Sequence, residues 1–198
     1  MNTKGRTALA VAVGSDHVDV INLLLSHTDI DINAGDDTPL YTATGSRRYD
    51  ITRLLLNNSQ IDVNKGSRSA HPMYVPAHNG DTEMVKLLIK HPQTDVNSRS
   101  YSWTALIIAT KRRMTEVVKI LLRCPRTDIA IKDSSGKTAL DYAKEKGYTD
   151  IIDAFDSRHT LMDVTGPTCT GTIQCITNAM FQHVFSPEFA AQSFRLLC

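Results

Sequence analysis

Apolar and polar residues follow one another along residues 98–130 in an order that predicts two short helices. Thr104-Ala105-Leu106 opens a first apolar run, and residues 117–122 form a second run about one helix later. Apolar residues at positions i, i+3 and i+4 are typical of an amphipathic helix. A polar stretch precedes the first run and a loop follows the second, so residues 98–130 are predicted to form one helix–turn–helix unit.

This layout occurs five times along the chain. The tripeptides that open the first run begin at residues 7, 38, 71, 104 and 138, so the spacings are 31, 33, 33 and 34 residues. A repeat of this length is typical of stacked units that bury their apolar faces against one another. We predict units over residues 2–33, 34–64, 65–97, 98–130 and 131–158, followed by a C-terminal extension over residues 159–198.

The polar residues at the ends of the predicted helices suit their positions. Threonine opens four of the five tripeptides, where its hydroxyl can accept a hydrogen bond from an N–H group of the first turn. Pro39 follows such a threonine at the first helical position, which needs no donor. Gly80 and Gly147 come where the first helix ends, and glycine readily takes a left-handed conformation there. The polar stretch before each tripeptide is predicted to be a hairpin-like turn.

Three units depart from this pattern at the end of the first helix, and one departs inside it. Asp16, Arg47 and Arg113 occupy the glycine position, where a left-handed conformation costs about 1 kcal/mol for a residue with a side chain. In the third unit Pro76 falls inside the expected first helix, where proline costs about 3 kcal/mol. His71 is also a poorer cap than threonine. We therefore predict that the first helix of the third unit is short, kinked or shifted.

The units resemble the ankyrin repeat, whose pattern runs D-x-x-G-x-T-P-L-H-x-A-A-x-x-G-H-x-E-I-V-x-x-L-L. The best match is residues 133–140, Asp-Ser-Ser-Gly-Lys-Thr-Ala-Leu, and residues 79–88 match the later part of the pattern. The resemblance covers residues 1–158 and implies an all-α fold, an ankyrin-repeat α-solenoid with an extra C-terminal segment. It also implies a protein–protein interaction module, an adaptor or scaffold that binds a partner protein on its concave face as a monomer.

The family's binding face is built from turn tips and exposed first-helix residues, so candidates are carried over by position. Tyrosine, tryptophan and arginine most often carry interface energy, which places Trp103, Tyr101, Arg112 and Arg68 first. An alternative role for Trp103 is packing against the neighbouring turn. The remaining partner-binding candidates are Lys111, Tyr74, His78, Tyr41, Lys137, Lys4 and Arg6.

Asparagine closes three of the units, at Asn33, Asn64 and Asn97, each after an Asp-Ile or Asp-Val pair. Some intracellular asparaginyl hydroxylases modify ankyrin repeats in this context, so the three residues are hydroxylation candidates by resemblance. We predict that their main role is structural, with each side chain bonding the backbone of the adjacent turn.

Composition and motifs argue against several other functions. A net charge of +1 gives no basic surface for nucleic acid, and no apolar run approaches the 18 residues of a membrane span. The sequence holds no glycine-rich phosphate loop, no G-x-S-x-G and no H-E-x-x-H. We therefore predict a protein that is not an enzyme, uses no cofactor and lies in the cytoplasm or nucleus. The ligand-type residues of the tail, at irregular spacings that do not predict a metal site, are His159, Cys169, Cys175, His183 and Cys198.

Two alternatives to an independent adaptor stay open. The first unit begins close to Met1 without a dedicated polar cap, which favours a fragment or targeting part of a larger multidomain protein. The other alternative is a substrate-receptor adaptor for ubiquitin ligation, although residues 159–198 contain no recognisable recruitment box. The extension either covers the last unit or is poorly ordered.

Overall fold

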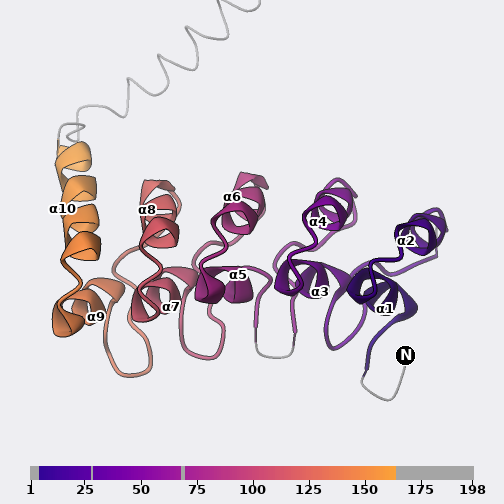
Figure 1. The fold of residues 1–198 in the computed structure, drawn as a ribbon, viewed down its shortest axis with the longest axis horizontal. Helices are drawn as coiled ribbons and strands as arrows, with labels where there is room; N and C mark the ends of the chain where they lie inside the picture. Colours follow the sequence, from indigo (N-terminus) through magenta and orange to yellow (C-terminus); the bar gives the residue numbers. More distant parts are fainter. Residues whose placement is uncertain (1–4, 28, 68–69, 164–198) are drawn as a thin grey trace, which may run out of the picture. The chain divides into compact units, whose positions relative to one another are not determined.

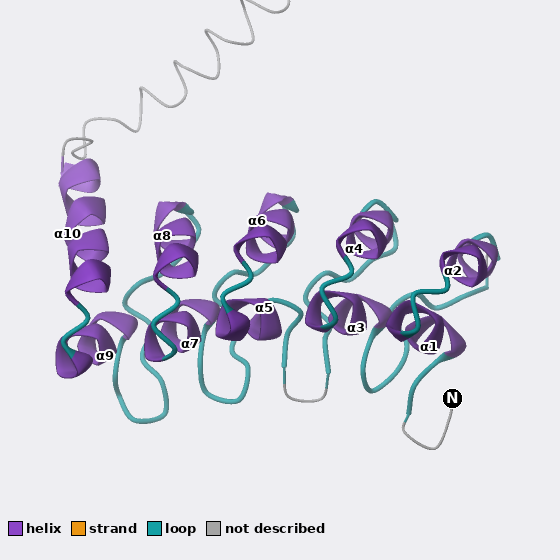
Figure 2. Cartoon of the chain, viewed as in Figure 1, coloured by secondary structure: helices purple, strands orange, loops and turns teal. Residues whose placement is uncertain are grey.

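The helices of the computed structural model, which describes residues 5–27, 29–67 and 70–163, form five pairs. No strand occurs in these ranges, which confirms the predicted all-α fold. Figures 1 and 2 show the first helices of the pairs in one layer and the second helices in another, with long loops projecting from the first layer. The helices are α1 Ala8–Gly14, α2 Val18–Leu25, α3 Pro39–Gly45, α4 Tyr49–Leu56, α5 Tyr74–Asn79, α6 Thr82–Lys90, α7 Ala105–Lys111, α8 Thr115–Arg123, α9 Ala139–Lys146 and α10 Thr149–Asp163.

The chain divides into two compact units, residues 1–156 and 157–198, and α10 runs across the division. The helix pairs belong to the first unit, apart from residues 157–163 of α10. The predicted C-terminal extension lies outside the described residues beyond residue 163, so neither its ordering nor a capping role is tested.

Threonine caps open four of the five first helices, as predicted. The Oγ1 atom of Thr38 accepts a hydrogen bond from the N–H of Tyr41 at 3.1 Å, and Thr7, Thr104 and Thr138 accept in the same way. Each such cap is worth about 1 kcal/mol. These caps set where each first helix begins and therefore where the preceding loop must end.

The third unit is the exception, and its first helix is short and shifted as predicted. Helix α5 spans six residues, and its N-cap Met73 makes no side-chain hydrogen bond. In the other units the helix begins directly after the threonine, but here it begins at Tyr74, three residues after His71. Pro76 then lies in the first turn of α5, where its missing N–H is not needed. The expected cost of an interior proline is therefore avoided by the later start.

A left-handed residue lies in the turn after every first helix, nine residues after the start of the opening tripeptide, whether or not that residue is glycine. Gly80 and Gly147 have φ of 75° and 67°, and Asp16, Arg47 and Arg113 have φ of 61°, 58° and 57°. The turn geometry is thus retained in all five units, and the three larger residues bear the conformational cost.

Apolar side chains of both helices in each pair form one continuous core. The leucine of the opening tripeptide is buried in three units, at Leu9, Leu40 and Leu106. Burying one such side chain stabilises the fold by about 1.5–3 kcal/mol. The second helices contribute the fully buried residues Ile21, Leu55, Met84, Leu88, Leu121, Ile151 and Phe155.

Asparagine side chains bond the backbone of an adjacent turn, as predicted, and the structure shows that this turn belongs to the next unit. The Nδ2 of Asn33 donates to the carbonyl of Gln60 at 2.7 Å, and its Oδ1 accepts from the N–H of Asp62 at 2.8 Å. Its own turn is held instead by Asp31, whose Oδ1 accepts from the Asn33 N–H. Asn64 and Asn97 bridge to the next unit in the same way.

Candidate functional site

Four aromatic rings from the second, third and fourth units lie near one another on the surface of loop tips and first helices. We name Tyr41, Tyr74, His78 and Tyr101 the tyrosine group. The rings of Tyr74 and Tyr101 meet edge to face with centroids 5.5 Å apart, and those of Tyr74 and His78 are 6.0 Å apart. The sequence predicts these residues as separate candidates. The stacking of the units places the Tyr74 ring against Tyr101, and Tyr41 within electrostatic reach of both.

Tyr101 owes its exposure to a tight turn at the tip of the fourth loop. Ser100 and Trp103 exchange two backbone hydrogen bonds, of 2.9 and 3.0 Å, so only Tyr101 and Ser102 cross the tip. Tyr101 has φ of 61°, a conformation that is uncommon for a residue with a side chain. Its side chain is 67% exposed. A strained conformation that holds a large aromatic ring in solvent points to a role outside the fold.

Burial favours the neutral form of two phenols in the tyrosine group, those of Tyr41 and Tyr74. Burial raises the pKa of Tyr41 and of Tyr74 above the ordinary value for a phenol. The positive charge of Arg112 acts in the opposite direction on the pKa of Tyr74, so the guanidinium lies within electrostatic reach of that ring. Both phenols therefore stay protonated near neutral pH and can donate as well as accept hydrogen bonds.

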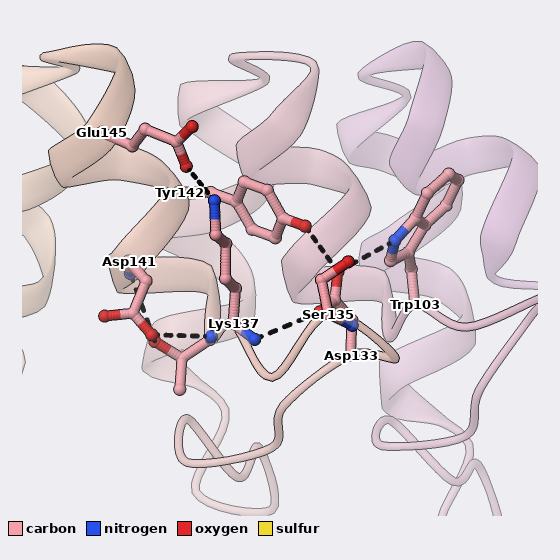
Figure 3. Close-up of polar contacts among 8 residues, drawn as sticks. Trp103, Asp133, Ser135, Lys137, Asp141, Tyr142 and Glu145 are labelled. Atoms are coloured by element: carbon pink, nitrogen blue, oxygen red, sulfur yellow. Dashed lines mark hydrogen bonds and ion pairs between the residues drawn. The ribbon is translucent and has the colours of Figure 1, made fainter.

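A second set of side chains, at the junction of the fourth and fifth units, is organised by a buried carboxylate. We name Trp103, Lys111, Asp133, Lys137 and Tyr142 the Trp103 group. Asp133 accepts from the hydroxyl of Tyr142 at 2.6 Å and from Nε1 of Trp103 at 3.3 Å (Figure 3). It also accepts from the backbone N–H groups of Ser135 and Lys137 within its own turn.

Lysines complete the Trp103 group by covering its rings. The Nζ of Lys111 lies 4.4 Å from the ring centroid of Trp103 and 4.2 Å from that of Tyr142. Lys137 pairs with Glu145 at 2.6 Å and lies 5.5 Å from the Tyr142 ring centroid (Figure 3). Lys111 and Trp103 of the fourth unit thus both reach the fifth unit, which corresponds to the alternative role of Trp103 as a residue packed against the neighbouring turn.

The charge state of Asp133 follows from its surroundings. Burial acts to raise the pKa of Asp133, but hydrogen bonds from the Tyr142 hydroxyl and from the Lys137 and Ser135 amides outweigh it. The pKa of Asp133 is therefore below its ordinary value, and the carboxylate is charged near neutral pH. A carboxylate with this many donors serves to hold the loop and the two rings in place.

The other predicted residues are spread along the same surface. Arg6 lies at the N-terminal end and its Nε is 3.5 Å from a carboxylate oxygen of Asp37. Arg112 is exposed at the end of α7. Lys4 and Arg68 lie outside the described residues.

Sequence reasoning missed Asp133 and Tyr142 as members of the site. Asp133 opens the D-x-x-G turn of the fifth unit, a position that signals a turn and not a contact to another unit. Tyr142 sits four residues after the capping Thr138, on the side of α9 that faces α7. The place of each residue in the repeat was the only indication of its role in the sequence. The hydrogen bond from Trp103 to Asp133 depends on how the fourth unit packs against the fifth.

Metal binding and membrane crossing can be assessed only for the described residues. These residues hold no cluster of three or more histidine, cysteine or acidic side chains that could bind a metal. The cysteines of the tail are outside them, and Cys124 is a buried free thiol. No helix within the described ranges is both long and apolar enough to cross a membrane.

Comparisons with known proteins agree with the repeat pattern. The family model described as ankyrin repeats (3 copies) matches residues 1–67 and 72–157. Among solved structures, the crystal structure of EF0377, an ankyrin repeat protein, is 30% identical in sequence and has a TM-score of 0.70. That match covers 79% of this chain and 82% of the other. No curated protein matches the chain.

Proposed function

Because the chain belongs to the ankyrin-repeat family, we propose that it is an adaptor or scaffold that binds a partner protein on its loop tips and first helices. Ankyrin repeats are generally protein-interaction modules, and the family is typically non-catalytic. The candidate surface is the layer of first helices with the loops that project from it (Figure 2).

The observation that carries this proposal is the exposure of Tyr101 beside a second aromatic ring and a cation. Tyr101 is 67% exposed, and its ring meets Tyr74 edge to face. Arg112 lies within electrostatic reach of Tyr74. Tyrosine and arginine are enriched among residues that dominate binding energy, because they offer large contact area together with hydrogen-bonding groups. We therefore place the centre of the interface at Tyr101, Tyr74 and Arg112.

Trp103 and Lys111 have a supporting role in this proposal. Both make contacts with the fifth unit, through Asp133 and Tyr142. A ring that is hydrogen-bonded and covered by a cation offers less free area to a partner. Their contribution is to hold the loop of the fourth unit so that Tyr101 has one orientation, which lowers the entropy lost on binding.

Affinity measurements on paired variants test the proposal. Proteins captured by the wild-type chain would be produced pure, and their affinities for the wild type, for Tyr74→Ala/Tyr101→Ala and for a Lys86→Ala/Lys119→Ala control would be measured by calorimetry. The control removes two lysines of the second-helix layer that pair only with glutamates of their own helices. Loss of two central aromatic residues should weaken binding by at least about tenfold. A change within about twofold for the tyrosine variant, with the control unchanged, would place the partner elsewhere.

Urea unfolding of single variants distinguishes a loss of binding contacts from a loss of stability. Trp103→Ala should lower the urea midpoint of the chain, because it removes a hydrogen bond and a ring from the junction of two units. Tyr101→Ala should leave that midpoint nearly unchanged, since its side chain is mostly in solvent. If both variants unfolded like the wild type and only Trp103→Ala lost the partner, Trp103 and not Tyr101 would be the contact residue.

A further inference from the structure

The loops of the third and fourth units form a surface pocket beside Tyr101, which we name the loop pocket. Its volume is about 580 Å³. Lys65 and His71 of the third unit and Arg99 and Tyr101 of the fourth are among the residues that line it. Tyr101 belongs both to this lining and to the tyrosine group, so the loop pocket adjoins the surface proposed for partner binding.

Hydrogen bonds hold the two loops that line the loop pocket. The N–H of His71 donates to Oγ of Ser100 at 2.9 Å and so joins the third loop to the fourth. Nδ1 of His71 lies 2.6 Å from the carbonyl oxygen of Asn64, which only accepts, so Nδ1 carries the proton. The Asn64 side chain in turn bonds the backbone of Gln93 and Asp95. A ligand would therefore meet a preformed pocket, which lowers the entropy lost on binding.

The charge of the loop pocket is positive. Lys65 and Arg99 are both exposed, and neither forms an ion pair with a residue of the described ranges. No aspartate or glutamate is among the described residues that line the pocket. Arg47 and Arg113, by contrast, each have a carboxylate partner within the chain. A pocket with two cations and no carboxylate in its described lining favours an anionic ligand.

The fifth unit places an anion where the fourth unit places a cation. Asp133 and Arg99 hold the same repeat position, five residues before the threonine cap of their units. The carboxylate of Asp133 accepts from the N–H groups of Ser135 and Lys137. Tyr101 is the counterpart of Ser135, and its N–H donates to no acceptor in the described part of the chain. The fourth loop therefore has an arginine and an available amide where the fifth loop has its own carboxylate.

We propose that the loop pocket binds an aspartate or glutamate side chain of the partner, within an acidic segment that also contacts Tyr101. This rests on the proposed function, because it gives the chemistry of the partner at the same surface. The carboxylate would pair with Lys65 and Arg99, and a guanidinium can bind a carboxylate through two parallel hydrogen bonds. Carboxylate is the favoured anion because the chain itself uses one, Asp133, at this position of the fifth unit.

Nuclear magnetic resonance titrations of the full chain with capped hexaglutamate test this. The peptide should shift the amide signals of Lys65, His71, Arg99 and Tyr101 in a saturable way, whereas capped hexalysine should not. Raising the salt concentration from about 0.05 to about 0.5 M should weaken the binding of hexaglutamate, because salt screens exposed charges.

Paired variants assign the binding to the loop pocket. Lys65→Ala/Arg99→Ala should raise the dissociation constant of hexaglutamate at least about tenfold, because two charge-assisted contacts are lost. Lys90→Ala/Arg123→Ala removes two exposed cations from the second helices and should change that constant by less than about twofold. Far-ultraviolet circular dichroism checks that both variants fold.

Several results would overturn an acidic ligand. Hexaglutamate could leave the four amide signals unmoved, or bind Lys65→Ala/Arg99→Ala as tightly as the control variant. Equal shifts with hexalysine would show that charge does not direct the binding. Inorganic phosphate and a phosphotyrosine peptide are titrated in parallel, and binding of these alone would make the pocket a phosphate site.

Calorimetry with the captured partner distinguishes failure of this proposal from failure of the proposed function. Affinity lost in Tyr74→Ala/Tyr101→Ala but kept in Lys65→Ala/Arg99→Ala would retain the partner surface and rule out the acidic contact. Affinity kept in both variants would overturn both proposals. An acidic contact requires that both variants bind the partner at least about tenfold more weakly than the wild type.

Discussion

A buried aspartate gathers hydrogen-bond donors from both sides at two of the junctions between units. Asp81 accepts from Arg47 and Tyr49 of the preceding unit at 3.0 Å each, and it also caps α6 through the N–H of Met84. Asp133 does the same for Trp103 of the fourth unit and Tyr142 of the fifth. A buried carboxylate is tolerated because each lone pair has a donor, so removing the charge should be costly.

The stabilisation by Asp133 should depend on pH. Its pKa in the folded chain is lowered, because the donors that face it outweigh the effect of burial. The unfolded value is about 3.9, so the stabilisation is complete above about pH 5 and is lost as pH falls through the lower, folded pKa. Urea unfolding of Asp133→Asn at pH 7 should show a free energy of unfolding about 1–3 kcal/mol below the wild type.

The pH series also supplies the control for this prediction. The difference between Asp133→Asn and the wild type should shrink as pH falls from about 4 towards 2, because the wild-type carboxyl then becomes neutral too. If the difference stayed constant over this range, the packing of the Asp133 side chain, and not its charge, would stabilise the junction.

Substituting two arginines at the same repeat position distinguishes the cost of backbone strain from the stabilisation by ion pairing. Arg47 and Arg113 have φ of 58° and 57°, so replacement by glycine should relieve the same strain of about 1–2 kcal/mol. Arg47 pairs at 3.0 Å with Asp81, whose side chain is 4% exposed, whereas Arg113 lies 3.7 Å from the more exposed Asp150. Arg113→Gly should therefore have the higher urea midpoint of the two variants. Equal midpoints would mean that the Arg47–Asp81 pair adds no more stability than the contacts of Arg113, whose guanidinium carbon also lies 5.1 Å from the ring centroid of Tyr148.

At the scale of elements, the third unit is where the repeat is weakest. Helix α5 has six residues and lacks a side-chain cap, whereas α7 has seven residues, a threonine cap and a nearly continuous buried surface. Proline in the first turn of α5 removes no hydrogen bond. The late start of α5 therefore allows the helix to form without a kink at Pro76. The result is a shorter helix with less buried area between two regular neighbours.

Hydrogen exchange should show this difference between helices. Amides of α5 should exchange at least about tenfold faster than those of α7, because fewer intrahelical bonds and less packing oppose local opening. Mass spectrometry of peptides covering residues 74–80 and 105–112 makes the comparison within one sample. Equal protection of the two peptides would show that the neighbouring units hold α5 as firmly as α7.

Within residues 5–156, each helix pair lies beside its neighbours in the stack. The effect of a destabilising substitution on the rest of the stack should therefore depend on which unit contains it. Leu9 and Leu106 hold the same repeat position and are 1% and 2% exposed. Leu106→Ala in the fourth unit should lower the global free energy of unfolding by about 2–5 kcal/mol. Leu9→Ala should instead let α1 and α2 open locally, with a smaller shift in the global transition. Urea unfolding combined with hydrogen exchange distinguishes the two, and equal global shifts would mean that the stack unfolds as one body.

Sequence by itself determined the architecture of the repeats. The spacing of threonine tripeptides and apolar runs predicted the helix pairs, and Pro76 predicted the irregular third unit. These features are local, because caps, left-handed turns and amphipathic faces depend on residues three to four positions apart. The surface of loop tips and first helices was likewise predictable from position in the repeat.

Only the tertiary structure decided which side chains meet across units. The Asn33 side chain bonds the loop of the next unit and not its own turn, and Trp103 donates a hydrogen bond to Asp133 of the fifth unit. Such contacts join residues about 30 positions apart, and their geometry depends on how one unit is rotated against the next. The exposure of Tyr101 was decided at the same level, because burial of a repeat position depends on whether a neighbouring unit covers it.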